Sequence, residues 1–326
     1  MSTTAAGLTV DLAAATDLDR MTALIGSWSS PSARVVSAEV VDHKRGRRAL
    51  LRYRVDDQVP DGSESLLAKL YGDAAQAERV HDLMSRLDQE VFAASHGLGV
   101  PRAVGWSADP PLVVYRPAPG ADFDDTADGS QRDAVTRAAR WLTRLHGSRL
   151  ALDRRLDVDH EVANAVQWGV TIAEAMPALA TEAEAAAASL QSTAARLRAR
   201  TDVPIHKDFH HQHLVLRPDF LAVVDLDEAR LGDPALDVAH FVVNLELRAI
   251  RSPADRSPSL RRAFLDAYRA ETGWAADERF AFFSRYTAVK IAKQLAVGSG
   301  LRPRPSGAEA VRQARLVLES AAGAES

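Results

Sequence analysis

The chain contains no cysteine among its 326 residues. This absence excludes disulfide bonds, thiolate metal sites and a cysteine nucleophile. The sequence also lacks a G-x-x-x-x-G-K-[ST] motif, so a P-loop nucleotide site is not expected. No uncharged apolar run reaches the roughly 18 residues of a membrane-spanning helix, and no basic region precedes an apolar stretch at the start. We therefore expect a soluble, cytoplasmic protein without a membrane partner.

An excess of either charge is also missing. Lysine and arginine together number 40 and the acidic residues 44, which gives a net charge of -4. Such a balance offers no basic surface for nucleic acid, so we expect no nucleic-acid partner. A hydrophobic content of 46% over this length favours about two domains, each with its own core.

Lysine is scarce, because only five of the 40 basic residues are lysines and the rest are arginines. One of them, Lys69, lies in the apolar run Ser65–Tyr71, which reads S-L-L-A-K-L-Y. An exposed edge strand is one interpretation of such a lysine. Apolar residues on both faces of the strand favour the other, a buried lysine that needs an anionic partner.

The first third of the chain predicts a small antiparallel sheet with one inserted helix. Residues 33–56 form two β-prone runs around H-K-R-G-R-R, a hairpin signal in which Gly46 is free to adopt a positive φ. Residues 74–94 have helical spacing, and V-P-R-A-V-G-W and P-L-V-V-Y-R predict two further strands. The Pro- and Gly-rich connection 117–120 then marks a boundary, which predicts an N-terminal domain of residues 1–116 and a C-terminal domain of residues 117–326.

The second domain is expected to be mostly helical. The predicted helices are 130–146, 160–200 with a break at Met176-Pro177, 237–250, 259–271, 277–297 and 306–322. Residues 203–241 interrupt them with two short apolar runs, 214–216 and 221–224, which predict a buried hairpin. Histidines and aspartates stand at the ends of these runs, where a divalent cation can offset the repulsion between carboxylates.

The segment H-K-D-F-H-H-Q-H-L-V-L, followed by V-V-D-L-D-E-A-R-L-G-D-P-A-L-D-V-A, resembles the catalytic core of the aminoglycoside phosphotransferase and choline kinase family. That family has the pattern H-G-D-x-H-x-x-N, a hydrophobic hairpin, and then I-D-x-x-x-x-x-x-G-D-P-x-x-D-L-A. The resemblance implies an α+β, bilobal protein-kinase-like fold, with a small antiparallel sheet and one helix in the N-terminal lobe and a mostly helical C-terminal lobe. It also implies an ATP- or GTP-dependent transfer of the γ-phosphate to a hydroxyl, with Mg²⁺ as the metal.

The resemblance also assigns roles to individual residues. Asp208 is the implied catalytic base and Asp225 the implied Mg²⁺ ligand. Lys69 would reach the nucleotide phosphates, paired with a helix carboxylate, for which Glu90 is preferred and Glu78 is the alternative. Further implied roles are the adenine contact for Tyr115 and Pro117, phosphate cover for the loop at Gly46, a structural brace for His206, and a bond to the catalytic-loop amides for Asp237.

The chain departs from the family pattern at the second metal ligand. The family has asparagine five residues after the catalytic aspartate, whereas this chain has His213, and Mg²⁺ prefers oxygen to imidazole. Gln212 and Asp227 are the candidates for a compensating oxygen. Lys207 also replaces the usual glycine, and the phosphate loop has a single glycine, Gly46.

Two alternatives accompany the kinase hypothesis. Histidines 206, 210, 211 and 213 suggest a zinc-dependent hydrolase, but their spacing matches no common zinc motif. A pseudokinase that binds nucleotide or peptide, or activates a protein partner, would follow if His213 prevents metal binding. The acceptor hydroxyl remains open among aminoglycosides, macrolides, amino alcohols, sugars and peptides. Four glutamates in residues 161–184 suit a cationic acceptor or a solvated helix equally well.

Overall fold

The computed structural model describes residues 11–44, 48–56, 63–93, 97–252, 257–298 and 305–322. The chain divides into two compact units. The first contains residues 1–120 and 217–227, and the second contains residues 121–216 and 228–326. The predicted domains, residues 1–116 and 117–326, were continuous, whereas the first of these units also includes residues 217–227.

A five-stranded antiparallel sheet forms the centre of the first unit, in the order β1-β2-β3-β6-β5. Its strands are β1 (Arg34–Lys44), β2 (Arg48–Asp56), β3 (Ser63–Tyr71), β5 (Arg102–Ala108) and β6 (Pro111–Arg116). Side chains alternate between the two faces of a strand, so successive residues of β3 enter different environments. Leu66, Ala68 and Leu70 belong to a buried core that also includes Met21 and Ile25.

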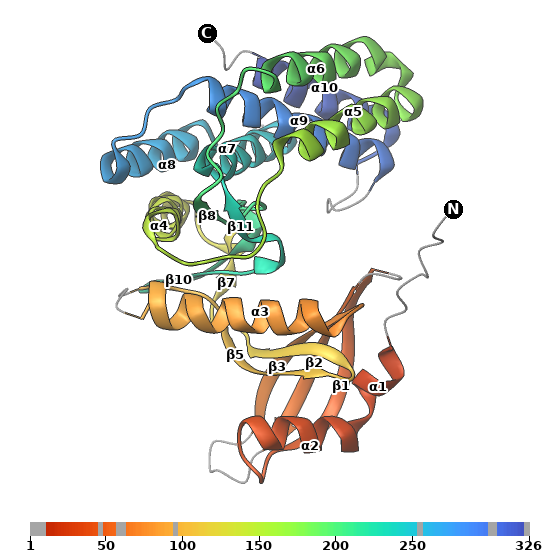
Figure 1. Ribbon diagram of the computed structural model, residues 1–326, viewed down its shortest axis with the longest axis vertical. Helices are drawn as coiled ribbons and strands as arrows, with labels where there is room; N and C mark the ends of the chain where they lie inside the picture. Colours follow the sequence, from red (N-terminus) through yellow and green to blue (C-terminus); the bar gives the residue numbers. More distant parts are fainter. Residues whose placement is uncertain are drawn as a thin grey trace. The chain divides into compact units, whose positions relative to one another are not determined.

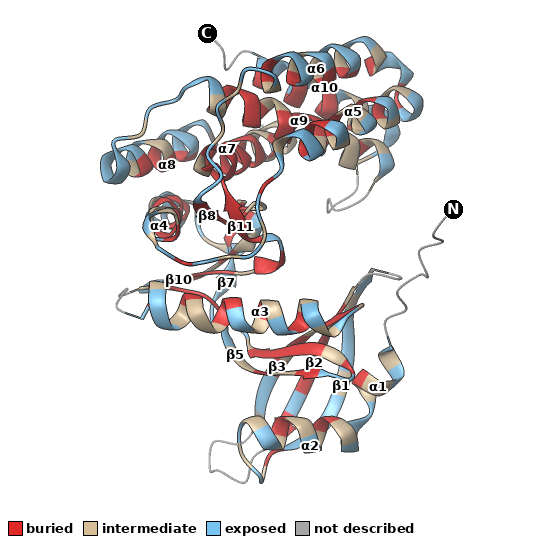
Figure 2. Ribbon diagram, viewed as in Figure 1, coloured by how far each residue is buried: buried red, intermediate tan, exposed pale blue. Residues whose placement is uncertain are grey.

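Helices cover this sheet. The residues Met21 and Ile25 of the core come from α2 (Leu18–Trp28), which follows the short α1 (Leu12–Thr16). Helix α3 (Ala74–Arg86) packs against β3, β5 and β6 and runs along the sheet in Figure 1. Figure 2 shows buried residues along the strands of this sheet. Lys69 lies between the buried residues Ala68 and Leu70 of β3, and its side chain is only 15% exposed. The exposed edge-strand interpretation of Lys69 is wrong.

The helix after β3 was predicted as one segment over residues 74–94. The α-helix begins after Asp73, whose carboxylate accepts a hydrogen bond from the Gln76 N–H at 2.7 Å and caps the helix. It changes at Leu87–Val91 to a π-helical turn, η1. A π-helical turn changes the direction of side chains relative to a continuous α-helix, because each turn contains an extra residue.

Residues 217–227 enter the first unit through β10 (Phe220–Val223), which pairs in parallel with β4 (Leu98–Gly99). A Cβ atom at Gly99 would lie 2.8 Å from the ring of Phe220, so glycine allows this close approach. The pairing delivers the residues that follow β10, including Asp225 and Asp227, to the first unit.

The second unit is mostly helical, as predicted. Its longer helices are α4 (Asp128–Gly147), α5 (Val158–Ala175), α6 (Ala180–Ala194), α7 (Pro234–Arg251), α8 (Ser257–Thr272), α9 (Glu278–Val297) and α10 (Gly307–Ala322). Two short antiparallel pairs accompany them, β8 (Val203–Ile205) with β11 (Arg230–Gly232) and β7 (Ala121–Asp122) with β9 (Leu214–Arg217). No helix in the described ranges is long and apolar enough to cross a membrane.

Helix α7 holds Asp237 in place within the second unit. Pro234 stands in its first turn, where a missing N–H costs nothing, and Asp233 caps it by accepting from the Ala235 N–H at 2.9 Å. Most of α7 is buried, and it packs against α8, α9 and α10. Asp237 is thus held in the first turn of a buried helix and is itself 0% exposed.

Candidate active site

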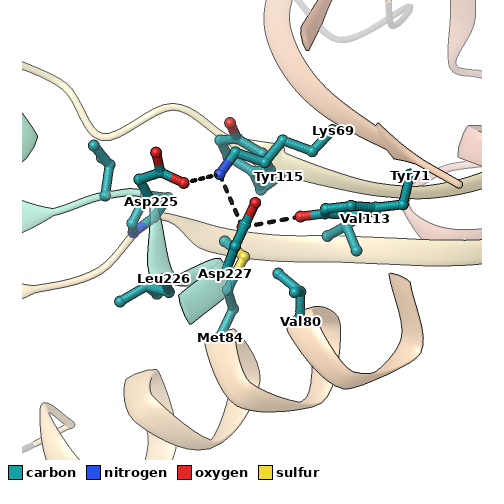
Figure 3. Close-up of a pocket in the computed structure, with 11 residues that line it drawn as sticks. Lys69, Tyr71, Val80, Met84, Val113, Tyr115, Asp225, Leu226 and Asp227 are labelled. Atoms are coloured by element: carbon teal, nitrogen blue, oxygen red, sulfur yellow. Dashed lines mark hydrogen bonds and ion pairs between the residues drawn. The ribbon is translucent and has the colours of Figure 1, made fainter. Parts of the chain in front are cut away.

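The first unit contains a small cavity in which charged and aromatic residues meet. It is lined by Lys69 and Tyr71 from β3, Val80 and Met84 from α3, Pro101, Val113 and Tyr115 from the sheet region, and the segment Val224–Asp227 (Figure 3). The lining is apolar on the helix side and carries acids and a lysine elsewhere. This distribution suits a ligand with a flat apolar part and an anionic part.

Lys69 lies between two carboxylates. Its Nζ atom is 2.6 Å from Asp225 Oδ1 and 2.9 Å from Asp227 Oδ1 (Figure 3). Burial by itself would lower the pKa of Lys69, but the two carboxylates raise it above its ordinary value. Lys69 is therefore a permanent cation at neutral pH.

Arg48 contacts the same pair of carboxylates. Its Nη1 atom is 2.9 Å from Asp227 Oδ2 and 3.3 Å from Asp225 Oδ1. The hydroxyl of Tyr71 also donates to Asp227 Oδ1 at 3.0 Å. The cluster therefore contains two cations and two carboxylates, and its charges balance.

Asp225 has φ of 61°, a left-handed conformation that a non-glycine residue adopts at a cost of about 1 kcal/mol or more. The strain is consistent with a functional position, because the ion pairs with Lys69 and Arg48 hold the carboxylate in place. The side chain of Asp225 is 21% exposed, against 5% for Asp227.

The predicted partner of Lys69 is wrong. Glu90 is exposed and its carboxylate pairs with Arg86, four residues earlier, at 3.0 Å. The alternative, Glu78, is also exposed. The π-helical turn and the exposed face of α3 separate these glutamates from the cavity, and Val80 and Met84 take the cavity-facing positions.

The other predicted nucleotide contacts have mixed positions. Tyr115 lines the cavity, and burial raises its pKa to about 12. Pro117 is exposed and does not belong to the lining. Gly46 lies outside the described residues.

In the second unit, Asp208 is surrounded by cations and imidazoles. Its Oδ1 atom is 2.8 Å from Lys290 Nζ and 3.0 Å from His240 Nε2. Burial would raise the pKa of Asp208, but Lys290 and His240 hold it well below its usual range. Asp208 is therefore a carboxylate at neutral pH and a weak base.

Asp237 braces the loop that carries Asp208. Its carboxylate accepts hydrogen bonds from the backbone N–H groups of His206 and Lys207, each at 2.7 Å, and lies 3.1 Å from His146 Nε2. The expected contact with the loop amides is thus present. His206 is fully buried, and its Nδ1 atom accepts from the Asp208 N–H at 3.3 Å.

Lys207 explains why the family has glycine at its position. Its φ is 70°, in the left-handed region that glycine adopts without a steric penalty. Lys207 compensates through its side chain, because its Nζ atom lies 2.6 Å from Glu161 Oε1. Glu161 is 5% exposed and also accepts from the hydroxyl of Tyr286. Glu161 is therefore engaged within the fold and does not face a substrate as an isolated acid.

His213 is held by the loop itself. Its Nδ1 atom is 2.9 Å from the backbone oxygen of Asp208, and its ring centre is 3.8 Å from that of His210. Ligand atoms of Asp208, His210 and His213 lie within 4.8 Å of one another. This set contains two nitrogen donors, so its chemistry does not suit Mg²⁺. Gln212, the alternative oxygen donor, is exposed.

Sequence reasoning missed Arg48, Tyr71, His240 and Lys290. Lys290 is far from Asp208 in the sequence, and only the scarcity of lysine gives it prominence. Arg48 stands in an arginine-rich stretch where no single arginine is distinguished. The pairing of β10 with β4, which brings Asp227 to Lys69, has no local sequence signal.

A model of the phosphotransferase enzyme family matches residues 43–280. No curated protein matches the chain. Choline kinase LicA from Streptococcus pneumoniae has a similar structure, with a TM-score of 0.58 at 16% identity over 92% of this chain and 99% of that chain.

Two further solved structures are similar. A thermostable mutant of aminoglycoside phosphotransferase APH(4)-Ia has a TM-score of 0.59 at 16% identity, over 89% of this chain and 96% of that chain. Glucosamine kinase in complex with glucosamine, ADP and inorganic phosphate has a TM-score of 0.57 at 15% identity, over 94% and 83% of the two chains. These likenesses confirm the predicted α+β, kinase-like fold.

Proposed function

Because the chain belongs to the phosphotransferase enzyme family and is thus a phosphotransferase acting on hydroxyl groups, we propose that it transfers the γ-phosphoryl group of ATP or GTP to a small molecule. The observation that carries the proposal is the cluster of Lys69, Arg48, Asp225 and Asp227 at an apolar cavity. Nucleotide binding needs cations that contact the phosphates, carboxylate oxygens that hold a metal, and an apolar wall that packs against the nucleobase.

In the proposed reaction, Asp208 accepts a hydrogen bond from the acceptor hydroxyl and orients its oxygen toward the γ-phosphorus. A new P–O bond forms there, the bond between the γ-phosphorus and the bridging oxygen breaks, and the nucleoside diphosphate leaves. The hydroxyl proton passes to Asp208 late in the step, because Lys290 and His240 keep this carboxylate a weak base.

Asp225 is the proposed Mg²⁺ ligand. Its carboxylate is the more exposed of the two in the cluster, and carboxylate oxygen is the donor that Mg²⁺ prefers. When bound, Mg²⁺ supplies positive charge that offsets the charge developing on the phosphate oxygens. His213 contributes no suitable oxygen, so we assign it to holding the loop through its contact with the Asp208 carbonyl.

The surroundings of Asp208 favour a neutral or anionic acceptor over a polycation. Lys290 contacts Asp208 directly, and Lys207 directly precedes it in the loop. Glu161, a buried acid on α5, is engaged by Lys207 and Tyr286 and is not available to a cationic substrate. A matched pair of sugars, one with an amine in place of one hydroxyl, tests this preference. A higher kcat/KM for the neutral sugar is expected, and a higher value for the amino sugar would contradict it.

Nucleotide binding tests the proposed function. The protein is titrated with ATP and with GTP, each with and without Mg²⁺, and its thermal unfolding is followed. A ligand at about 100 times its dissociation constant stabilises a fold by roughly 2.7 kcal/mol, which raises the unfolding temperature measurably. We expect a shift that depends on Mg²⁺ and loses this dependence in Asp225→Ala. The absence of a shift with either nucleotide would contradict the proposal, and a shift indifferent to Mg²⁺ would favour a pseudokinase.

A further inference from the structure

The family resemblance implies that Lys69 pairs with a glutamate on the helix after β3, but its carboxylate partners in this chain are Asp225 and Asp227. Both are on the segment that follows β10, at distances of 2.6 Å and 2.9 Å from Nζ. The glutamate expected on the helix is instead paired with Arg86. A buried lysine needs a fixed anionic partner, so one of the two aspartates must hold it when the other binds a metal.

The helix face toward the cavity offers no replacement. Val80 and Met84, four residues apart and thus on one side of α3, line the cavity (Figure 3). Apolar side chains there pack against a ligand but cannot orient an ammonium group. In this chain α3 therefore forms a wall of the cavity and supplies none of its charge.

Asp227 and Asp225 have different surroundings. Asp227 accepts from Lys69, Arg48 and the hydroxyl of Tyr71. These donors engage both of its oxygens, and its side chain is 5% exposed. Arg48 and Lys69 also donate to both oxygens of Asp225, but its side chain is more exposed, at 21%. Asp227 is enclosed by its donors and is suited to holding Lys69 in place, so we call it the anchor of Lys69. Asp225 is the more accessible of the two to a metal.

Arg48 is the second unassigned cation. It opens β2 and reaches the same carboxylates as Lys69, with its side chain 31% exposed. A nucleoside triphosphate carries more negative charge than one lysine and one metal neutralise, and a guanidinium binds phosphate oxygens in a bidentate manner.

Resting on the proposed function, we propose that Asp227 positions Lys69 for the nucleotide phosphates in place of a helix glutamate, and that Arg48 is a second phosphate-binding cation. Asp227 is then a positioning residue and not a metal ligand. Asp225 alone supplies the carboxylate for Mg²⁺ in this segment.

The anchor is tested on the protein without nucleotide, through the rate at which an amine-acylating reagent modifies Lys69, measured by peptide mass spectrometry. An ammonium held by carboxylates is a poor nucleophile, so Asp227→Asn should increase the rate about tenfold. Glu90→Gln is the matched control and should leave the rate unchanged. Tyr71→Phe, which keeps the carboxylate, should give a smaller increase and serves if Asp227→Asn does not fold. An effect of Glu90→Gln equal to that of Asp227→Asn would overturn the anchor.

The metal assignment is tested by the Mg²⁺ concentration that gives half of the nucleotide-dependent thermal shift. Asp225→Asn should raise this concentration about tenfold or more, while Asp227→Asn, which loosens Lys69 but removes no metal ligand, should raise it far less. An equal rise in Asp227→Asn would make Asp227 a metal ligand and overturn the inference. A wild-type protein that binds no nucleotide would instead overturn the proposed function itself, and the acylation result would remain interpretable.

Arg48 is tested by nucleotide affinity. Arg48→Met should weaken ATP binding about tenfold or more both with and without Mg²⁺, since the variant loses a charged hydrogen bond to the phosphates. Arg52→Met is the control, because Arg52 is on the same strand and pairs with Glu39 on the exposed surface. Unchanged affinity in Arg48→Met would remove Arg48 from the phosphate site.

Discussion

Replacing Asp237 with asparagine isolates the brace of the catalytic loop. The wild-type carboxylate is fully buried and accepts two backbone N–H groups at 2.7 Å, besides its contact with His146. Asparagine has one acceptor oxygen, so one buried N–H loses its partner. The NH₂ group of the asparagine then points toward a backbone N–H, which is also a donor and cannot accept a hydrogen bond from it. An unsatisfied buried donor costs about 1–3 kcal/mol, and the lost charge weakens the remaining hydrogen bond, so we expect a loss of about 3 kcal/mol.

The assay is urea unfolding followed by tryptophan fluorescence. Trp141 is a suitable reporter, because its ring centre is 6.2 Å from that of His206. Asp277→Asn is the control, since Asp277 caps the exposed start of α9 and asparagine caps helices well. The control should lose only a few tenths of a kcal/mol. A loss in Asp237→Asn no larger than in the control would refute the bracing role.

Three further predictions concern the second unit. Burial would raise the pKa of Glu161, but Lys207 and Tyr286 hold this pKa below its ordinary value. The ion pair therefore stabilises the fold fully above about pH 4.3, the ordinary pKa of glutamate, and this stabilisation is lost as the pH falls through the lower pKa of the folded state. Glu161→Gln should thus lower the urea midpoint at neutral pH and match wild type at acidic pH, and a constant difference would contradict this. Gly232→Ala should lower the free energy of unfolding by about 1–3 kcal/mol in thermal unfolding, because the new Cβ would lie 2.5 Å from Ile205 Cδ1. Gly147→Ala is the control and should not destabilise the fold, because a Cβ at Gly147 meets no atom within 4 Å. Lys290→Met should lower kcat and leave nucleotide affinity unchanged. Lys290→Arg should recover part of kcat, and the control Lys293→Met should not change it. Equal turnover in Lys290→Met and wild type would exclude Lys290 from the reaction.

The long elements could be predicted because their patterns are local. Apolar alternation in β2 and β3 and the apolar stripes of α4, α7 and α9 follow from the periods of the two structures. The two- and three-residue strands β4, β7, β8 and β11 could not be predicted, because such short segments become strands only when they form hydrogen bonds with a neighbouring strand. The π-helical turn at Leu87–Val91 likewise has no period of its own in the sequence.

The candidate site shows the same division. Asp208, Asp225 and Lys69 stand out because charges interrupt apolar runs, and Asp237 follows from the start of a helix. The pairing of Lys69 with Glu90 was wrong because Glu90 lies in the π-helical turn after α3, where its carboxylate pairs with Arg86. Asp227 and Lys290 acquire their roles from contacts across the fold, to Lys69 and Asp208 respectively.

Phosphoryl transfer to a hydroxyl is the central claim, and mass spectrometry of acceptors tests it most directly. The wild-type protein is incubated with ATP or GTP, Mg²⁺ and a panel of sugars, amino sugars, amino alcohols and antibiotics. Asp208→Asn, which keeps the shape of the side chain but removes its charge, is the matched control. The account predicts that one class of acceptor gains the mass of a phosphoryl group with wild type and not with the variant. Phosphorylation of no acceptor by the wild-type protein would contradict the central claim, and equal phosphorylation by wild type and Asp208→Asn would contradict the role of Asp208.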